Sequence, residues 1–570
     1  MPPKRHDKIT AGGAVLARLK AVGVDYIFAN SGTDFPPIIE GLAEAAAKQI
    51  PLPQAIVIPH ESAAMAMAHG YYLASGRAQA VMAHTNVGLA NCAIGAINAA
   101  TEHIPVILFS GRTPTTERGR LGSRTVPIGW GQEMRDQTAL VREACKWDYE
   151  LRFPEQALEL IDRAHAIASS TPKGPVYLSL PREVLCELCP ADALDRASIM
   201  QPVTAAAPAA LVQQAAEMLA AAKNPVIIAQ RGAGSVEGFA TLGKLASDWG
   251  IPVLQYWAIQ LAIATDHPMS VGSDPKAWLE EADVVLAIDS LAPWSPAIHE
   301  LGAGCKVIQL GPDPLYQRVP VRNFRADVAL GGEIADTLTS LADAMRPLLA
   351  KHRESRDLRR AHVSDAAQSL RKTIRSKAEA GNAGVATKAW ASLCLSEAIA
   401  GRDATVLSEL GCPLDPLTLR EHGAWYQEPH SGGLGWSFPA GLGMLLAKPD
   451  RLTVATMGDG SYMFANPVAC HQIAESLGLP LLVLILNNSE WGAVRHSVLD
   501  IYPRGHAAKT NVMPLTSLKP SPDFVRIAEA SRTFAQRVDK ADELPAALKR
   551  AIDHVTTKKT QALIDIRVAP

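Results

Sequence analysis

The sequence predicts an α/β protein of three domains, each a doubly wound parallel sheet with helices on both faces. Short apolar runs of strand length alternate with alanine-rich helical stretches along the whole chain, which is typical of βαβ units. This alternation lapses twice, and a chain of 570 residues is too long for one hydrophobic core. The two lapses therefore divide the chain into three segments.

The first segment, residues 1–190, is predicted to form an N-terminal domain that ends where the pattern lapses into a linker at 191–208. Its apolar runs are short and rich in valine, isoleucine and leucine, as buried parallel strands usually are. Its strands are expected at residues 55–59, 78–84, 104–111 and 174–180.

The second segment is predicted to be a central Rossmann-like domain over residues 205–350, and the third a C-terminal domain over residues 385–570. Between them, residues 351–384 are dense in charge and poor in apolar residues, which indicates a solvated helical linker. The first and third segments are similar in size and organisation. The central strands are expected at 224–230, 251–257, 283–290 and 305–311. The C-terminal strands are expected at 404–410, 451–458, 479–487 and 561–568.

Composition and charge argue against several classes of protein. A net charge of −2 gives no basic surface for nucleic acid or for an anionic membrane. No uncharged apolar stretch of about 18 residues predicts a membrane-spanning helix. The basic N-terminal stretch MPPKRHDKIT lacks the apolar run of a signal peptide. We therefore expect a globular enzyme that acts on small molecules.

The eight cysteines are scattered and include one local pair, Cys186 and Cys189. A CxxC pair that binds a metal or performs redox chemistry would need a second pair or thioredoxin-like surroundings, and the sequence has neither. We expect buried or inert thiols, and a reducing cytoplasmic location.

Polar residues follow two neighbouring strands of the third segment. The sequence GDG, residues 458–460, directly follows the strand expected at 451–458, and the sequence NN, residues 487–488, ends the strand expected at 479–487. Ligands of open α/β sheets gather beyond the carboxyl ends of the strands. Asp459 and the two asparagines are therefore expected at one edge of the sheet.

This edge has the features of a site for a metal and a phosphate group. Gly458 and Gly460 would let backbone approach a ligand closely, and the N-terminus of the helix expected after Ser461 would favour an anion. Carboxylate, amide and carbonyl oxygens suit Mg²⁺, which prefers few protein ligands plus phosphate oxygens. The pattern predicts a metal-bridged diphosphate between two βα turns. The alternative is an Asp-Gly turn and an unrelated Asn-Asn turn.

With 26 residues between GDG and NN, this pattern resembles the thiamin-diphosphate signature of the pyruvate decarboxylase and acetohydroxyacid synthase superfamily. The resemblance implies that Asp459, the side chain of Asn488 and the backbone carbonyl of Glu490 ligate Mg²⁺. It also implies that Ser461 contacts the diphosphate of the bound cofactor.

The stretch PHESAAMAMAHGYYLASG, residues 59–76, resembles the superfamily's HE…GYA pattern. The resemblance places Glu61 at the glutamate that hydrogen-bonds ring nitrogen N1′ of the cofactor and so promotes loss of the C2 proton. The alternative is a glutamate in the first turn of a helix, where the helix dipole stabilises it.

The stretch HSGGLGW, residues 430–436, resembles the glycine-rich segment that precedes GDG in the same superfamily. Leu434 matches the bulky residue that wedges between the two cofactor rings, and Gly432 matches the residue whose carbonyl accepts a hydrogen bond from the 4′-amino group. The alternative for Leu434 is an ordinary core leucine.

Within the superfamily, the stretch NNSEWGAVRH resembles benzoylformate-decarboxylase-like members. His84, 23 residues after Glu61, matches an active-site histidine of that branch and could shuttle protons at the substrate carbonyl. The alternative is a structural histidine at a strand end. Two weaker candidates are His430, before the glycine pair, and Thr33 in SGTDFPP, whose hydroxyl could bind the substrate carboxylate.

The resemblance implies a thiamin-diphosphate- and Mg²⁺-dependent 2-oxo acid decarboxylase with carboligase capacity, acting on a small 2-oxo acid or aldehyde. It also implies pyrimidine-binding, central and diphosphate-binding domains, and a homodimer as the minimal active unit within a homotetramer.

Several alternatives remain open. One is an acetolactate-synthase-like carboligase, or a C–C lyase, with the same cofactor. FAD or another nucleotide in the central domain would rest on the single glycine turn AQRGAGS, residues 229–235. A non-catalytic scaffold of the same fold is a further alternative, although Glu61, Asp459 and Asn488 are all present.

Overall fold

The computed structural model describes residues 8–189 and 198–569, and it divides into two compact units. One unit contains the chain up to residue 204 together with residues 429–449. The other contains residues 205–428 and 450–570. The N-terminal stretch 1–7 and residues 191–197 of the linker expected at 191–208 lie outside the described residues.

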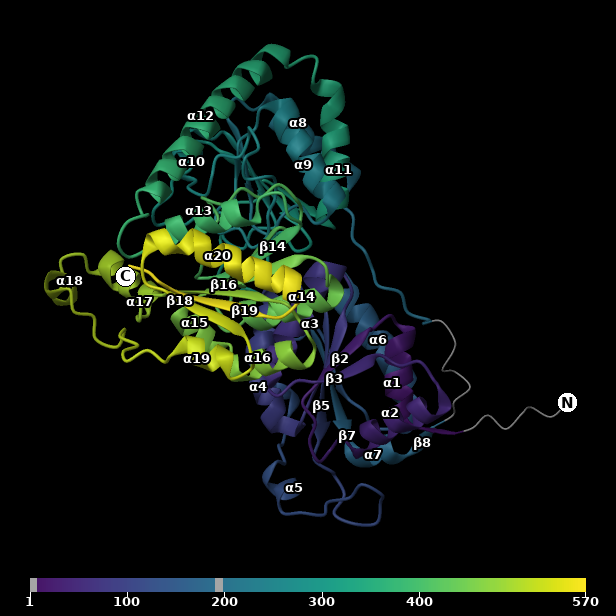
Figure 1. The fold of residues 1–570 in the computed structure, drawn as a ribbon. Helices are drawn as coiled ribbons and strands as arrows, with labels where there is room; N and C mark the ends of the chain where they lie inside the picture. Colours follow the sequence, from purple (N-terminus) through teal and green to yellow (C-terminus); the bar gives the residue numbers. More distant parts are fainter. Residues whose placement is uncertain (1–7, 190–197, 570) are drawn as a thin grey trace. The chain divides into compact units, whose positions relative to one another are not determined.

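The first unit is built on a six-stranded sheet in which every neighbouring pair is parallel, with the order β3-β2-β4-β5-β7-β6. Figure 1 shows α1, α2 and α6 along one face of this sheet and α3 and α4 on the other. The strands are β2 (Tyr26–Ala29), β3 (Gln54–Val57), β4 (Gln79–Ala83), β5 (Val106–Arg112), β6 (Asp148–Glu150) and β7 (Val176–Pro181). The helices are α1 (Ala11–Ala21), α2 (Pro36–Lys48), α3 (Glu61–Ser75), α4 (Thr85–Thr101), α5 (Ile128–Gly131), α6 (Ala157–Ser169) and α7 (Arg182–Cys186). The short strands β1 (Ile9–Thr10) and β8 (Leu188–Cys189) form an antiparallel pair.

Helix α14 (Ser437–Ala447) belongs to the first unit and packs closely against α3. A Cβ atom on Gly70 would lie 1.9 Å from the carbonyl oxygen of Ala440, and one on Gly443 would lie 2.0 Å from that of Met67. The two backbones approach this closely only because both positions are glycine.

The second unit contains two parallel sheets. The five-stranded central sheet has the order β10-β9-β11-β12-β13. Its strands are β9 (Pro225–Ala229), β10 (Val253–Leu254), β11 (Val284–Ile288), β12 (Lys306–Gly311) and β13 (Val328–Gly331). Its helices are α8 (Ala209–Ala221), α9 (Val236–Trp249), α10 (Lys276–Glu281) and α11 (Ile334–Met345). Residues 351–384, expected to be a helical linker, contain the 27-residue helix α12 (Arg353–Glu379).

The third sheet is six-stranded and parallel, with the order β15-β14-β16-β17-β19-β18. Counted in chain order within each sheet, the first and third sheets share one arrangement, 2-1-3-4-6-5. The strands are β14 (Ala404–Glu409), β15 (Trp425–Gln427), β16 (Leu452–Gly458), β17 (Leu482–Asn487), β18 (Phe534–Val538) and β19 (Ala562–Arg567). The helices are α13 (Lys388–Ile399), α15 (Asp459–Phe464), α16 (Pro467–Ser476), α17 (Gly492–Ile501), α18 (His506–Thr510), α19 (Phe524–Glu529) and α20 (Leu544–Asp553).

The observed strands match the predicted apolar runs, and the sheets add strands that the sequence did not reveal. Four of the added strands, β6, β13, β15 and β18, lie at sheet edges, where one side of the strand lacks a neighbour and long apolar runs are not needed. Within the three large sheets, the remaining added strand is β2, which has four residues and lies inside the first sheet.

All eight cysteines are free thiols, and seven of them are buried, with Cys186 half-buried. In the described part of the chain, no helix combines the length and the apolar character needed to cross a bilayer.

Candidate active site

The carboxyl edge of the third sheet brings the GDG and NN sequences together. Strands β16 and β17 are parallel neighbours, with Gly458 opposite Leu486. Asp459 is the first residue after β16, and Asn488 is the first residue after β17. The acid and the amide therefore leave the sheet from adjacent strands at the same edge.

The side chain of Asp459 is buried, with only 2% of its surface exposed, and no hydrogen-bond donor among the described residues reaches its Oδ2 atom. Burial raises the pKa of this carboxyl to about 6, against the opposing effect of the backbone N–H groups of Asp459, Gly460 and Ser489. A buried carboxylate oxygen without a donor is suited to a cation. This observation fits a bound Mg²⁺.

The two asparagines have different functions. The Asn487 amide donates to Oδ1 of Asp565 at 3.0 Å, and its oxygen accepts the N–H of Ser489 at 3.1 Å, so this side chain holds the turn. The amide oxygen of Asn488 accepts the Glu490 N–H at 3.1 Å and keeps a second lone pair.

Glu490 offers a backbone oxygen rather than its carboxylate. Its carbonyl accepts the Gly492 N–H at 2.8 Å and retains a second lone pair. Its carboxylate already accepts from the Thr516 hydroxyl at 2.7 Å and from Arg495 at 3.2 Å. No group of three or more His, Cys, Asp or Glu residues in the described ranges could hold a metal. A cation at this edge would therefore need the mixed oxygen set of Asp459, Asn488 and the Glu490 carbonyl.

The glycines of the GDG turn differ in what surrounds them. A Cβ atom on Gly460 would lie 2.2 Å from a ring carbon of Trp491, so this glycine makes room for an indole ring. A Cβ atom on Gly458 would lie 3.9 Å from its nearest neighbours, the Leu410 carbonyl and the Ser461 hydroxyl, which is ordinary contact distance. Helix α15 begins at Asp459, not after Ser461 as expected, so the buried Ser461 lies inside its first turn.

Glu61 is the first residue of α3 in the first unit, and 6% of its surface is exposed. Its Oε1 accepts from the amide of Asn30 at 3.0 Å, and its Oε2 from the amide of Asn91 at 3.0 Å. Two neutral donors orient the carboxylate without neutralising it. No sequence pattern marked Asn30 or Asn91 as partners of Glu61. Asn30 follows β2, a strand that no apolar run had predicted.

His84 caps the N-terminus of α4 and is held from two sides. Its Nδ1 lies 2.5 Å from Oδ1 of Asp34, and its Nε2 lies 3.0 Å from Nε2 of Gln132. The hydrogen bond that His84 donates to the Asp34 carboxylate raises the pKa of His84, and burial lowers it. The negative charges of Asp34 and Glu61 raise the pKa further. The sequence analysis did not single out Asp34 or Gln132.

The segment 430–436 lies against α3 and α4 in the first unit. Gly432 has a positive φ of 69°, a conformation that favours glycine. Asn98 of α4 donates to the carbonyl of Gly433 at 2.9 Å and accepts from the Ser431 hydroxyl at 2.6 Å. The His430 N–H donates to Glu102 at 2.9 Å. The end of α4 therefore fixes the segment that carries Gly432.

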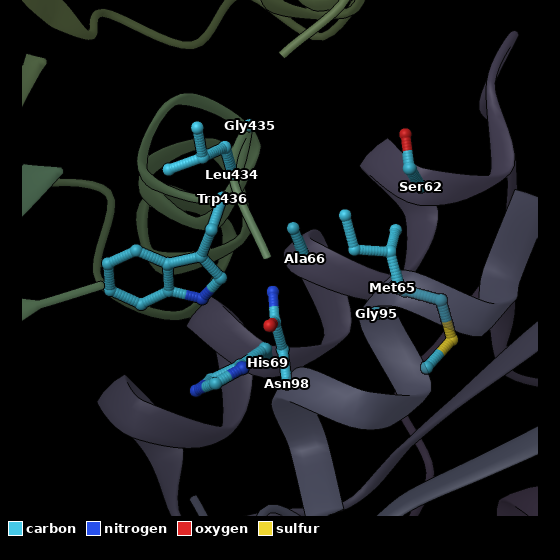
Figure 2. A pocket seen from close by; sticks show the side chains of 10 residues that line it. Ser62, Met65, Ala66, His69, Gly95, Asn98, Leu434, Gly435 and Trp436 are labelled. Carbon is cyan, nitrogen blue, oxygen red and sulfur yellow. The ribbon is translucent and has the colours of Figure 1, made fainter. Parts of the chain in front are cut away.

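Leu434 lines a small cavity between this segment and the two helices (Figure 2). Figure 2 shows Leu434 and Trp436 on one side, with Met65, Ala66 and His69 of α3 facing them. Burial lowers the pKa of His69 to about 4, so this ring is neutral, and its centre lies 5.4 Å from that of Trp436.

Thr33 lies in an exposed turn after β2, and its carbonyl accepts from Arg182 at 2.9 Å. The neighbouring Asp34 and Phe35 are buried and anchor the turn. The hydroxyl of Thr33 is the part of this residue that a substrate could reach.

The glycine turn of the central domain is filled by the chain's own residues. Gly232 and Gly234 both have positive φ angles. Cβ atoms on them would lie 3.1 Å from the side chain of Gln260 and 3.0 Å from that of Ile334. The backbone therefore turns tightly here and packs against protein.

A buried polar network lies at the carboxyl ends of the central strands. Arg231, after β9, donates to the hydroxyl of Tyr316, which donates to Asp289, after β11, at 2.8 Å. Arg231 also lies 3.7 Å from the Asp289 carboxylate. Arg322 stacks on the Tyr316 ring at 4.6 Å and donates to the Ser290 carbonyl at 2.8 Å. These polar groups satisfy one another.

Comparison with known proteins matches the chain to three family models in order. The N-terminal TPP binding domain of thiamine pyrophosphate enzymes matches residues 9–140, their central domain matches residues 212–341, and their C-terminal TPP binding domain matches residues 414–566. Thiamine pyrophosphate is the same compound as thiamin diphosphate.

The chain is similar over nearly its full length to several characterised or assigned proteins. A probable 2-ketoarginine decarboxylase of Pseudomonas aeruginosa is 27% identical, covering 96% of this chain and 93% of its own. Benzoylformate decarboxylase of the same organism is 26% identical, covering 94% and 95%. An acetolactate synthase of Mycobacterium bovis is 25% identical, covering 95% and 86%.

Among solved structures, the thiamine diphosphate-dependent 4-hydroxybenzoylformate decarboxylase of Rhodococcus jostii RHA1 superposes with a TM-score of 0.77. It is 22% identical and covers 98% of this chain and 99% of its own, which shows a common fold. Taken with the buried acid at the GDG turn and the three matched domains, these likenesses show that the chain belongs to the thiamine pyrophosphate enzyme family, alongside decarboxylases and acetolactate synthases.

Proposed function

We propose that the protein is a thiamin-diphosphate- and Mg²⁺-dependent 2-oxo acid decarboxylase that can also transfer the decarboxylated fragment to an aldehyde. The observation that carries this proposal is Glu61, a buried carboxylate held by the neutral amides of Asn30 and Asn91. This arrangement leaves its negative charge available to a protonated ring nitrogen, which is what the cofactor needs from the protein.

When bound, thiamin diphosphate supplies a nucleophilic carbon and an electron sink for the bond that breaks as CO₂ leaves. Glu61 accepts a hydrogen bond from the cofactor's N1′ atom, and Asn30 and Asn91 keep its carboxylate in place. Gly432 would offer its backbone carbonyl to the 4′-amino group, and Leu434 would pack against the bound cofactor.

Asp459, Asn488 and the Glu490 carbonyl hold Mg²⁺, which neutralises the diphosphate, and Ser461 contacts the diphosphate oxygens. The Oδ2 atom of Asp459, which no donor reaches among the described residues, supports these assignments. His84 exchanges a proton between its Nε2 and the substrate's carbonyl oxygen. Thr33 and His430 are weaker candidates for binding the substrate carboxylate.

An acetolactate-synthase-like carboligase is the second candidate, because the chain is about as similar to acetolactate synthases as to decarboxylases. The network of Arg231, Asp289 and Tyr316 argues against a flavin in the central domain, since these side chains fill the strand ends with one another. We propose that the protein contains no flavin, so that the purified protein is colourless.

We further propose a cytoplasmic homodimer, assembled into a homotetramer, as the active form. Eight free thiols are compatible with a reducing compartment. The resemblance to the superfamily supports the dimer, because pyrimidine and diphosphate are held there by different subunits. Light scattering after size-exclusion chromatography would measure the assembly directly.

The decisive experiment incubates the purified protein with thiamin diphosphate and Mg²⁺ and supplies benzoylformate, 2-ketoarginine or pyruvate, with and without an acceptor aldehyde. Aldehyde and CO₂ alone would identify a decarboxylase, and a 2-hydroxyketone or acetolactate would identify a carboligase. A protein that binds the cofactor but turns over none of these substrates would contradict the proposal.

Glu61→Gln tests the assigned acid within the same assay. The amide keeps the size of the side chain, so cofactor affinity should stay within about twofold while turnover falls by about a hundredfold or more. Unchanged turnover would remove Glu61 from its proposed function. Glu183→Gln, in α7, is the matched control for losing a buried acid in this unit.

A further inference from the structure

A buried carboxylate, Asp34, faces His84 across the carboxyl edge of the first sheet. Only 4% of its surface is exposed, and both of its oxygens have partners. Oδ1 lies 2.5 Å from Nδ1 of His84, and Oδ2 accepts the Thr85 N–H at 3.3 Å. No lysine or arginine in the described ranges forms an ion pair with it, so the imidazole is its only potential cationic partner.

Two glycines provide the space that this pair occupies. A Cβ atom on Gly111, in β5, would lie 1.4 Å from Oδ2 of Asp34. A Cβ atom on Gly32 would lie 2.1 Å from Nδ1 of His84. Any side chain at either position would separate the acid from the ring. The turn after β2, which carries Gly32 and Asp34, and strand β5, which carries Gly111, therefore leave room for the contact between Asp34 and His84.

The contact determines which nitrogen of His84 carries a proton. A carboxylate only accepts hydrogen bonds, so Nδ1 must be the protonated nitrogen. Nε2 then carries no proton and accepts a hydrogen bond from the side-chain NH2 of Gln132 at 3.0 Å, so it is the nitrogen that can gain a proton. The ionisable groups that face the ring, Asp34 after β2 and Glu61 at the start of α3, are both acidic and both favour the cation.

We propose that Asp34 is a positioning residue that fixes the orientation and the tautomer of His84 and presents Nε2 to the substrate. This inference rests on the proposed function, because it assigns Asp34 through the proton transfer proposed for His84. Asp34 itself does not contact the substrate. A buried carboxylate behind an imidazole also stabilises the positive charge that the ring gains when it accepts a proton.

The first test uses the apoprotein and needs no turnover. Diethyl pyrocarbonate modifies neutral imidazoles, and peptide mass spectrometry measures the modification of His84 as a function of pH. In Asp34→Asn the carboxylate is lost, so the modification midpoint should move to lower pH and the rate at about pH 6 should rise about fivefold. An unchanged midpoint would overturn the proposal.

Asp25→Asn is the matched control. Asp25 lies at the opposite end of β2, where it accepts from the Tyr71 hydroxyl at 2.9 Å and pairs with Arg77. Its loss removes an acid from the same strand without touching His84, so the His84 midpoint should not move. If Asp34→Asn fails to fold, Gly32→Ala tests the same contact by forcing the ring away from the acid, and the midpoint should again fall.

The second test uses the loaded enzyme. Asp34→Asn should lower kcat/KM by about tenfold or more and shift the pH limb that belongs to His84 to lower pH. In a His84→Gln background the same substitution should change kcat/KM by less than about twofold, because it acts through the ring. Equal losses in both backgrounds would overturn the proposal. A shifted modification midpoint with unchanged turnover would instead overturn the proposed catalytic function of His84, which separates the two failures.

Discussion

The central and third sheets of the second unit have similar topology but opposite chemistry at their carboxyl edges. At the central edge, Arg231, Tyr316 and Asp289 satisfy one another inside the protein. At the third edge, the buried Asp459 has an oxygen that no donor reaches among the residues that the structure describes.

The difference shows that topology alone does not locate a binding site. Both edges follow the rule that ligands gather beyond the carboxyl ends of parallel strands. Only one of them leaves a buried acceptor for something outside the chain. A polar group that is buried without a partner costs free energy, which supports the proposal that a cation completes the edge of the third sheet.

The largest expected effect is at the carboxyl edge of the central sheet, where polar side chains pair with one another. Arg231→Met should lower the free energy of unfolding by about 3 kcal/mol, because it leaves the Asp289 carboxylate buried without its cation. Cofactor affinity should not change. Arg325→Met, which removes an exposed partner of Asp327, is the control and should cost about 1 kcal/mol or less. Urea denaturation measures both values, and a loss of cofactor binding in Arg231→Met would break the comparison.

The next effect is at the carboxyl edge of the third sheet, where Asp459 lies. Asp459→Asn should weaken Mg²⁺-dependent binding of thiamin diphosphate by about a hundredfold, because the metal loses its charged ligand. The apoprotein should remain as stable as before, since a buried carboxylate becomes a neutral amide. Calorimetric titration measures the affinity. Asp450→Asn, an exposed acid before β16, should bind the cofactor normally. Normal binding by Asp459→Asn would contradict the metal assignment.

A third prediction sharpens the contrast within the GDG turn. Gly460→Ala should destabilise the protein by about 2 kcal/mol, because its Cβ would collide with the Trp491 ring. Adding Trp491→Leu should restore part of that loss. Gly458→Ala should leave stability almost unchanged, since its Cβ would meet its neighbours only at ordinary contact distance. Thermal unfolding separates these cases, and equal destabilisation by both alanines would count against the distinction.

The last effect is on the pH dependence of stability and concerns Glu428, a second buried acid near the carboxyl edge of the third sheet. Burial and the neighbouring Glu409 raise the pKa of Glu428 to about 8, against the hydrogen bond from the Leu410 N–H. The folded protein therefore keeps this proton while the unfolded chain releases it above its ordinary pKa of 4.5. Stability should fall as pH rises from about 4.5 to about 8, since the folded state binds more protons.

Glu428→Gln stays neutral at every pH and should remove this part of the decline. Its free energy of unfolding should match that of the wild type at about pH 5 and clearly exceed it at about pH 8.5. Denaturation at the two pH values provides the measurement. A difference that is the same at both would show that Glu428 does not titrate in this range.

The sequence located residues whose spacing follows from strand and helix lengths. Asp459 and Asn488 could be placed at one edge because each directly follows an apolar strand, and the two strands are consecutive. Glu61 could be placed at the start of a helix for the same reason. The domain boundaries and the individual site assignments stay predictions.

Partners contributed by distant or polar segments could not be found in this way. Asn98 holds the Gly433 carbonyl across 335 positions of sequence, and Asp34 reaches His84 across 50. The turn after β2 supplies both Asn30 and Asp34, and no apolar run had predicted β2. No local signal distinguished these amides and acids from ordinary polar residues in turns.

By itself, the sequence determined the α/β class, the parallel strands and the chemistry that Asp459, Asn488 and Glu61 can perform, because periodicity and residue type act over short distances. The tertiary structure decided that no donor among the described residues reaches one oxygen of the buried Asp459, that Asp34 holds His84, and that protein fills the glycine turn of the central domain. Those outcomes depend on contacts between segments far apart in the chain. Burial makes an unpaired carboxylate oxygen costly in free energy, and the lack of a Cβ in glycine matters where another segment packs closely against it.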